Sequence, residues 1–147
     1  MRLRRLAVLM IVMAALIVSV GKVQAENGPT LRLVYFYSTE CLHCMTIIDE
    51  VLTPLEAKYG DQLEVKLVEI SDPDKYEIMI RAEEMFGISS EDRGLPTLIV
   101  GGQVMIGEDQ IRYHLSCVLD SCVAAGGTAW PEIPGLEAIP VEGSASN

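Results

Sequence analysis

A pair of cysteines between two patterned segments constrains the fold of this chain more than any other feature. Residues 41–44 read Cys-Leu-His-Cys; an apolar run at residues 31–37 precedes them, and apolar residues at helical spacing follow. Two thiols separated by two residues can close a small disulfide ring. At the first turn of a helix, the first thiol also meets unpaired N–H groups and the positive end of the helix dipole. This placement favours a thiolate, so the pattern predicts thiol–disulfide exchange at Cys41.

The first 25 residues have the layout of a secretory leader. Three arginines lie within the first five residues, residues 6–20 are apolar and uncharged, and residues 23–25 end on alanine at the position a signal peptidase reads. The apolar run is shorter than the ~20 residues that span a bilayer, although flanking residues can extend it. We therefore expect a signal peptide or an N-terminal membrane anchor at residues 1–25. Either one predicts an extracytoplasmic location, periplasmic or cell-envelope, where disulfides persist.

The charge of the remaining chain limits its partners. The sequence holds 11 basic and 21 acidic residues, and the leader contains four of the basic ones and none of the acidic ones. Residues 26–147 therefore carry seven basic and 21 acidic side chains, a formal charge of −14. Such a surface repels phosphate backbones, so we expect no nucleic-acid binding. The length suits one modest core, and we expect a monomer.

The order of patterned segments predicts an α/β domain. The expected strands lie at residues 31–37, 63–70, 95–100 and 103–107, and the expected helices at 45–60, 78–86 and 108–119. A strand–helix–strand start implies a parallel pair with a right-handed crossover, and the diglycine at 101–102 predicts a C-terminal antiparallel hairpin. The sum is a mixed sheet with helices on both faces.

Two local features of this chain carry further expectations. A Thr-Pro pair at residues 53–54 predicts a kink, or a break and restart, in the first helix. We expect the domain to span residues 26–122. The remaining segment, 123–147, holds several glycines and prolines and lacks periodicity, which predicts an irregular or mobile tail.

This order resembles the thioredoxin-like superfamily over residues 31–119. The resemblance rests on the Cys-x-x-Cys pair at the first strand–helix junction and on Leu95-Pro96-Thr97 at the start of a later strand. It implies a redox-active disulfide in which Cys41 is the nucleophile and Cys44 resolves the mixed disulfide. It also implies that Pro96 is cis and lies beside the pair, and that the Leu95 backbone pairs with an extended client chain.

The residues around the two thiols give a mixed signal about the direction of electron flow. By resemblance, His43 stabilises the thiolate, and with it the reduced form, as in exported disulfide-forming oxidases and protein disulfide isomerases. Leu42 stands where the oxidases usually have proline and the isomerases glycine. Tyr35 stands where many members of the superfamily bury a carboxylate. Water, Glu40 or the tyrosine hydroxyl is then left as the proton acceptor near Cys44.

A second pair of cysteines, Cys117 and Cys122, lies near the end of the last expected helix. Within one straight helix, five residues rise ~7.5 Å, which exceeds the ~7 Å Cα separation that a disulfide tolerates. We therefore expect the helix to end near Asp120 and a structural disulfide to pin the tail. A free pair, a second redox pair that relays electrons to the first, and a zinc site built from all four cysteines are the alternatives.

The expected function is an exported thiol–disulfide oxidoreductase acting on protein cysteines, with His43 favouring the oxidase or isomerase direction. One alternative is a thioredoxin-type reductase fed by a membrane electron donor, as in cytochrome c maturation. A non-catalytic docking module is another, and a copper chaperone is a third, because paired exported thiols also bind copper. We expect protein thiol or disulfide clients, a membrane redox partner, no cofactor and no metal site.

Overall fold

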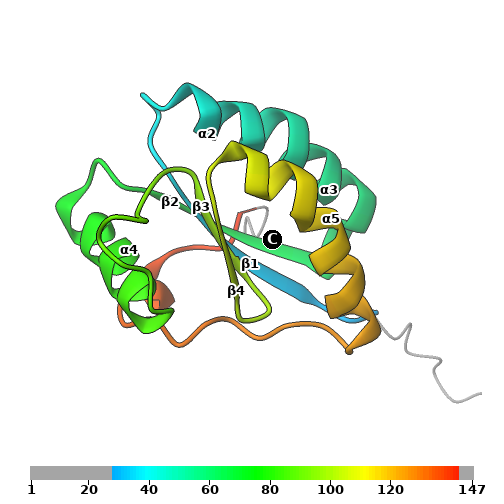
Figure 1. The fold of residues 1–147 in the computed structure, drawn as a ribbon. Coiled ribbons are helices and arrows are strands. Elements are labelled where there is room, and N and C mark those ends of the chain that lie inside the picture. The colour runs from blue at the N-terminus through cyan, green and yellow to red at the C-terminus, as the bar shows by residue number, and fades with distance from the viewer. Residues whose placement is uncertain (1–27, 143–147) are drawn as a thin grey trace, which may run out of the picture.

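A four-stranded mixed sheet organises the chain in the computed structural model, which describes residues 28–142 (Figure 1). The strand order is β2-β1-β3-β4. Strand β1 (Leu31–Tyr37) pairs in parallel with β2 (Leu63–Glu69) and antiparallel with β3 (Thr97–Val100). Strand β4 (Gln103–Ile106) returns beside β3 as an antiparallel hairpin. The predicted mixed sheet is confirmed, whereas the expected leader lies outside the described residues.

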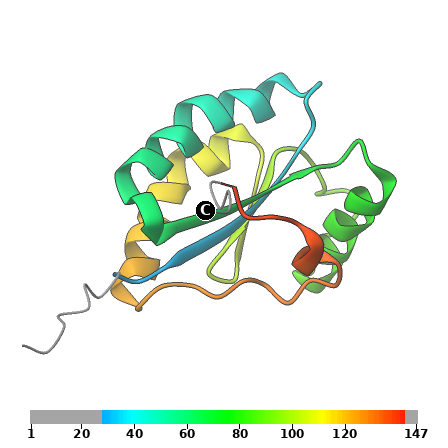
Figure 2. The ribbon, with the colours of Figure 1, turned by 180° about the vertical axis from the view of Figure 1, so that it is seen from behind.

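Helices cover the two faces of the sheet unequally, as Figures 1 and 2 show. One face carries α2 (Leu42–Ile47) and α3 (Thr53–Tyr59) together with the long helix α5 (Glu108–Ala124). The other face carries α4 (Pro73–Met85) and the C-terminal tail. Because β1 is central and its side chains alternate between the faces, it contributes to both hydrophobic clusters. It is buried along most of its length for that reason.

The first helix continues through the Thr-Pro pair without breaking. Between α2 and α3 lies a π-helical stretch, η1 (Ile48–Leu52), in which the Thr53 N–H donates to the carbonyl of Ile48 five residues earlier. Pro54 explains the change, because its ring would clash with the carbonyl four residues back. A π-turn widens the helix and so avoids that clash. The expected interruption near Thr53 therefore takes this form, and the helix does not restart.

The tail is part of the domain, which corrects the boundary expected after residue 122. Its backbone is mostly irregular, with one 3-10 turn, η3 (Leu136–Ala138), yet Ile133, Leu136 and Ile139 are buried in the cluster beneath α4. The Thr128 N–H also donates to the carbonyl of Thr30 at 2.8 Å. These apolar residues follow neither helical nor strand periodicity, so the sequence pattern did not reveal them as core.

A buried lysine anchors the tail to the sheet. Lys66 on β2 is 7 % exposed, and its ammonium donates to the carbonyl of Leu136 at 2.7 Å. The same ammonium lies 4.9 Å from the centre of the Trp130 ring. Burial lowers the pKa of Lys66, and the charge of Glu137 opposes that change. The tail thus covers Lys66, which the alternation of apolar and polar residues along β2 would place in solvent.

Candidate active site

The cysteine pair lies at the start of α2, directly after the turn that follows β1. Cys41 and Cys44 form a disulfide with a Cα–Cα separation of 5.2 Å. Cys41 occupies the N-cap position, and its sulfur accepts a hydrogen bond from the Cys44 N–H at 3.2 Å. Cys41 is half-buried, whereas Cys44 is fully buried. An incoming thiolate can therefore reach Cys41 and not Cys44.

The Leu-Pro segment lies at the same edge of the sheet as the cysteine pair. Phe36, at the end of β1, pairs with Thr97, the first residue of the antiparallel strand β3. The peptide bond between Leu95 and Pro96 is cis, and the Pro96 carbonyl accepts from the Gly107 N–H at 2.8 Å. Leu95 precedes the first residue of β3 by two positions, so it stands beyond the β1–β3 ladder.

A chain of charged side chains connects α2 to the start of α5. Nδ1 of His43 lies 2.6 Å from one carboxylate oxygen of Glu108, and the other oxygen accepts from Arg112 at 2.8 Å. Arg112 also donates to Glu50 at 3.0 Å. Hydrogen bonds from Arg112 and then from His43 lower the pKa of Glu108, so its carboxyl group is ionised at neutral pH.

Tyr35 supports the pair from the sheet side. Its side chain is fully buried, and its hydroxyl donates to the carbonyl of Cys44 at 2.8 Å. Burial raises the pKa of this hydroxyl well above its usual range, and the negative charge of Glu108 adds to the rise. Glu40, the other side chain considered as a proton acceptor, is exposed. Tyr35 therefore stays neutral and acts at the pair as a hydrogen-bond donor.

Glu108 and Arg112 are residues that the sequence analysis did not single out. Their spacing of four on a helix predicts an ion pair, which is a common surface feature. The contact between Glu108 and His43 joins residues 65 positions apart, so only the fold brings them together. The sequence feature that could have identified Glu108 as a site residue is its position directly after Gly107, at the end of the hairpin that leads back toward the site.

The expected disulfide between Cys117 and Cys122 does not form, because α5 does not end between them. The helix continues to Ala124, and both thiols are free. The two residues are therefore separated by the full helical rise of ~7.5 Å, which is too far for an unstrained disulfide. Cys117 is exposed, whereas Cys122 is half-buried.

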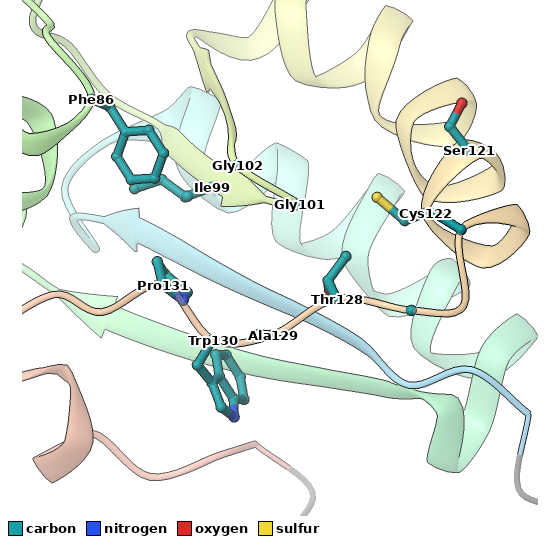
Figure 3. Close-up of a pocket in the computed structure, with 12 residues that line it drawn as sticks. Phe86, Ile99, Gly101, Gly102, Ser121, Cys122, Thr128, Ala129, Trp130 and Pro131 are labelled. Atoms are coloured by element: carbon teal, nitrogen blue, oxygen red, sulfur yellow. The ribbon is translucent and has the colours of Figure 1, made fainter.

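Cys122 lines a pocket beside the β3–β4 turn (Figure 3). This turn lies at the opposite end of the sheet from Cys41. The pocket has a volume of 470 Å³ and lies between the β3–β4 turn, the end of α5 and the tail around Trp130. Burial raises the pKa of the Cys122 thiol, which disfavours the reactive thiolate. The pocket and its thiol are therefore separate from the exchange chemistry of the first pair.

Two further features are absent from residues 28–142. In that part of the chain, no three side chains among histidine, cysteine, aspartate and glutamate gather as a metal site. No helix there is both long enough and apolar enough to cross a membrane.

Comparison with known proteins gives a distant similarity to a solved structure. No family model matches the chain, and no curated protein matches it. Among solved structures, that of thioredoxin-2, described as a component of the malaria parasite protein secretion machinery, matches 63 % of this chain and 84 % of its own, at 18 % identity and a TM-score of 0.42. The assignment is therefore made on this chain's own topology. With a parallel β1–β2 pair, an antiparallel β3–β4 hairpin and a disulfide at the first strand–helix junction, the chain has a thioredoxin-like fold.

Proposed function

We propose that this protein is an exported thiol–disulfide oxidoreductase that oxidises or isomerises the cysteines of client proteins. The observation that carries the proposal is the asymmetry of the pair, with a half-buried Cys41 at the helix N-cap and a fully buried Cys44. One sulfur can be attacked from outside, and the other is placed to leave and to return. A disulfide with a purely structural role does not need that division.

Exchange in the oxidising direction proceeds in two steps. A client thiolate attacks the sulfur of Cys41, a client–Cys41 bond forms, and Cys44 leaves with the electron pair as a thiolate. A second client thiolate then attacks the client sulfur of this mixed disulfide and releases Cys41 as a thiolate. Two electrons pass from the client to the pair, which ends reduced, while the client ends with a disulfide.

The helix start stabilises the leaving thiolate of Cys41. Its sulfur already accepts the Cys44 N–H, and the N-terminal end of α2 offers the positive end of the helix dipole. His43 lies on the same turn and adds a positive charge when it is protonated. These interactions favour the reduced pair, so they make the disulfide a better oxidant.

The edge of the sheet offers a place for the client chain. We propose that the Leu95 backbone pairs with an extended client segment, because it stands beside the site and beyond the first paired residue of β3. Leu42 adds an apolar surface next to Cys41, since its side chain is 77 % exposed. A chain docked on Leu95 would present its cysteine to the exposed side of the pair.

Export and a membrane partner complete the proposal. The basic start and the apolar run at residues 6–20 support export. A membrane redox protein would then reoxidise the pair after each cycle. The second candidate is a reductase that runs the same exchange backwards. The segment between α4 and β3 favours the reductase. This segment carries no helical insertion, and in that respect the chain resembles small reductive thioredoxins.

The proposal predicts transfer of the disulfide to a reduced, unfolded client protein. One equivalent of the oxidised protein, with residues 1–25 removed, should consume two client thiols and appear as the dithiol form. Thiol trapping with a mass-tagged maleimide, followed by gel electrophoresis, measures both changes together. A client that keeps its thiols while the Cys41–Cys44 disulfide survives would contradict the proposal.

A further inference from the structure

The environment of His43 differs from that of a free surface histidine. Its side chain is 71 % exposed, yet Nδ1 is held by the Glu108 carboxylate at 2.6 Å. Glu108 itself is only 24 % exposed, and Arg112 holds its second oxygen. The His43 ring, two residues from Cys41 in sequence, is thus tied to the first turn of α5, a different element of the fold.

We propose that Glu108 is a positioning residue of the cysteine pair, which acts by fixing the imidazole of His43 and so makes the disulfide a stronger oxidant. The inference deepens the proposed function and rests on it for its biological meaning. It assigns to α5 a role in exchange chemistry that the cysteine motif alone does not contain.

The hydrogen bonding settles which nitrogen of His43 is held. An ionised carboxylate can only accept hydrogen bonds, and Glu108 is ionised because Arg112 and His43 lower its pKa. Nδ1 of His43 must therefore carry the proton of this contact. Nε2 is left outside this contact, in the way that a carboxylate orients a catalytic imidazole elsewhere.

The proposed route from Glu108 to the pair runs through His43, whose ring it holds. The carboxylate of Glu108 also contacts Arg112, and Glu50 contacts the same Nη2 of Arg112. Tyr35, which faces the pair from β1, is neutral because burial and then Glu108 raise its pKa. His43 is thus the residue of this group nearest in sequence to Cys41. The proposal is that an imidazole fixed on the turn that carries Cys41 stabilises a thiolate there more than an unfixed imidazole does.

The test is the equilibrium of each variant with glutathione. One protein dithiol and one glutathione disulfide give one protein disulfide and two glutathione thiols, so atoms and electrons balance without a further reagent. Glu108→Gln should raise the equilibrium constant for forming the protein disulfide roughly threefold, as expected for loss of a modest surface ion pair. That change corresponds to about 14 mV at ~30 mV per tenfold for a two-electron couple.

A double-mutant cycle separates positioning from direct charge. In a His43→Asn background, Glu108→Gln should change the equilibrium constant by less than its effect in the wild type, ideally not at all. Glu50→Gln is the matched control, because Glu50 shares Arg112 but does not touch His43, and it should leave the constant unchanged. Circular dichroism melting verifies that each variant is folded.

Three results would overturn the inference: a constant unchanged by Glu108→Gln, a constant lowered by it, or an equal effect in the His43→Asn background. None of these measurements involves a client protein. A protein that shows the full cycle but transfers no disulfide to clients would contradict the proposed function and leave the role of Glu108 supported. A protein that oxidises clients but shows no coupling between Glu108 and His43 in the double-mutant cycle would support the proposed function and contradict the role of Glu108.

Discussion

Replacing Cys41 with serine is expected to abolish disulfide transfer to client thiols. Cys41 supplies the only sulfur of the pair that an incoming thiolate can reach, because Cys44 is fully buried. A hydroxyl at position 41 cannot form the mixed disulfide, so client oxidation should fall to the rate seen without protein. The loss should be complete at every client concentration, and the thiol-trapping experiment described above measures it.

Cys44→Ser should give a different result from Cys41→Ser. With Cys41 intact and no resolving thiol, a reduced variant mixed with a disulfide-containing client should accumulate a covalent protein–client complex that reducing agent releases. Cys122→Ser is the matched control, because this free thiol lines the pocket at the opposite end of the sheet. A Cys41→Ser variant that transfers no disulfide but keeps the protein's biological activity would favour a docking module over an enzyme.

Replacing Arg93 with methionine is expected to cause a large loss of stability. Arg93 lies in the segment that leads from α4 to Pro96, and its Nε is 3.2 Å from a carboxylate oxygen of Glu83. Glu83 is 0 % exposed, and within the described residues neither of its oxygens has a hydrogen-bond partner. Removing Arg93 strands a buried carboxylate, a change that typically costs about 3–5 kcal/mol.

Protonation of Glu83 limits this cost and gives it a pH signature. Burial raises the pKa of Glu83 while Arg93 opposes the rise, so removing Arg93 should raise this pKa further and favour the protonated form in the folded state. Holding a glutamic acid protonated at pH 7 costs ~3.7 kcal/mol, at ~1.36 kcal/mol per unit above a reference pKa of ~4.3. The folded state binds more protons above that reference, so the stability of the variant should fall as pH rises and should recover toward pH 4.

Urea unfolding of the Arg93→Met variant between pH 4 and pH 8 measures this effect. Adding Glu83→Gln should restore most of the free energy of unfolding at pH 7 and remove the added pH dependence. Glu84→Gln is the control, because Glu84 is 65 % exposed and lies 3.6 Å from Arg93. It should change stability by less than ~1 kcal/mol. A variant Arg93→Met as stable as the wild type at pH 7 would show that the ion pair does not hold this segment.

Local patterns in the sequence were sufficient to predict the sheet and the cysteine site. Strand β1 reads as an apolar run because it is covered on both faces, and the diglycine marks the β3–β4 turn. The cysteine pair and the Leu-Pro-Thr segment are local signals that the fold places at one edge of the sheet. Each of these features is encoded within a few neighbouring residues.

Contacts between distant segments could not be predicted in the same way. The tail buries Ile133 and Leu136 without any periodicity, because it packs as an irregular strap against α4. The end of α5 was misplaced because export suggested a disulfide, whereas the helix continues through Cys122. The pairing of Glu108 with His43 depends on how α5 crosses α2, which no local pattern records.

The most direct test of the central claim is the reduction potential of the Cys41–Cys44 pair, measured against glutathione mixtures at pH 7. The account predicts ready exchange and a potential nearer to about −120 mV than to about −270 mV, the values typical of a strong oxidant and of a reductant. A value near about −270 mV would reverse the proposed direction and support the reductase. A reduction potential below about −300 mV is typical of a structural disulfide, and such a value would contradict the account.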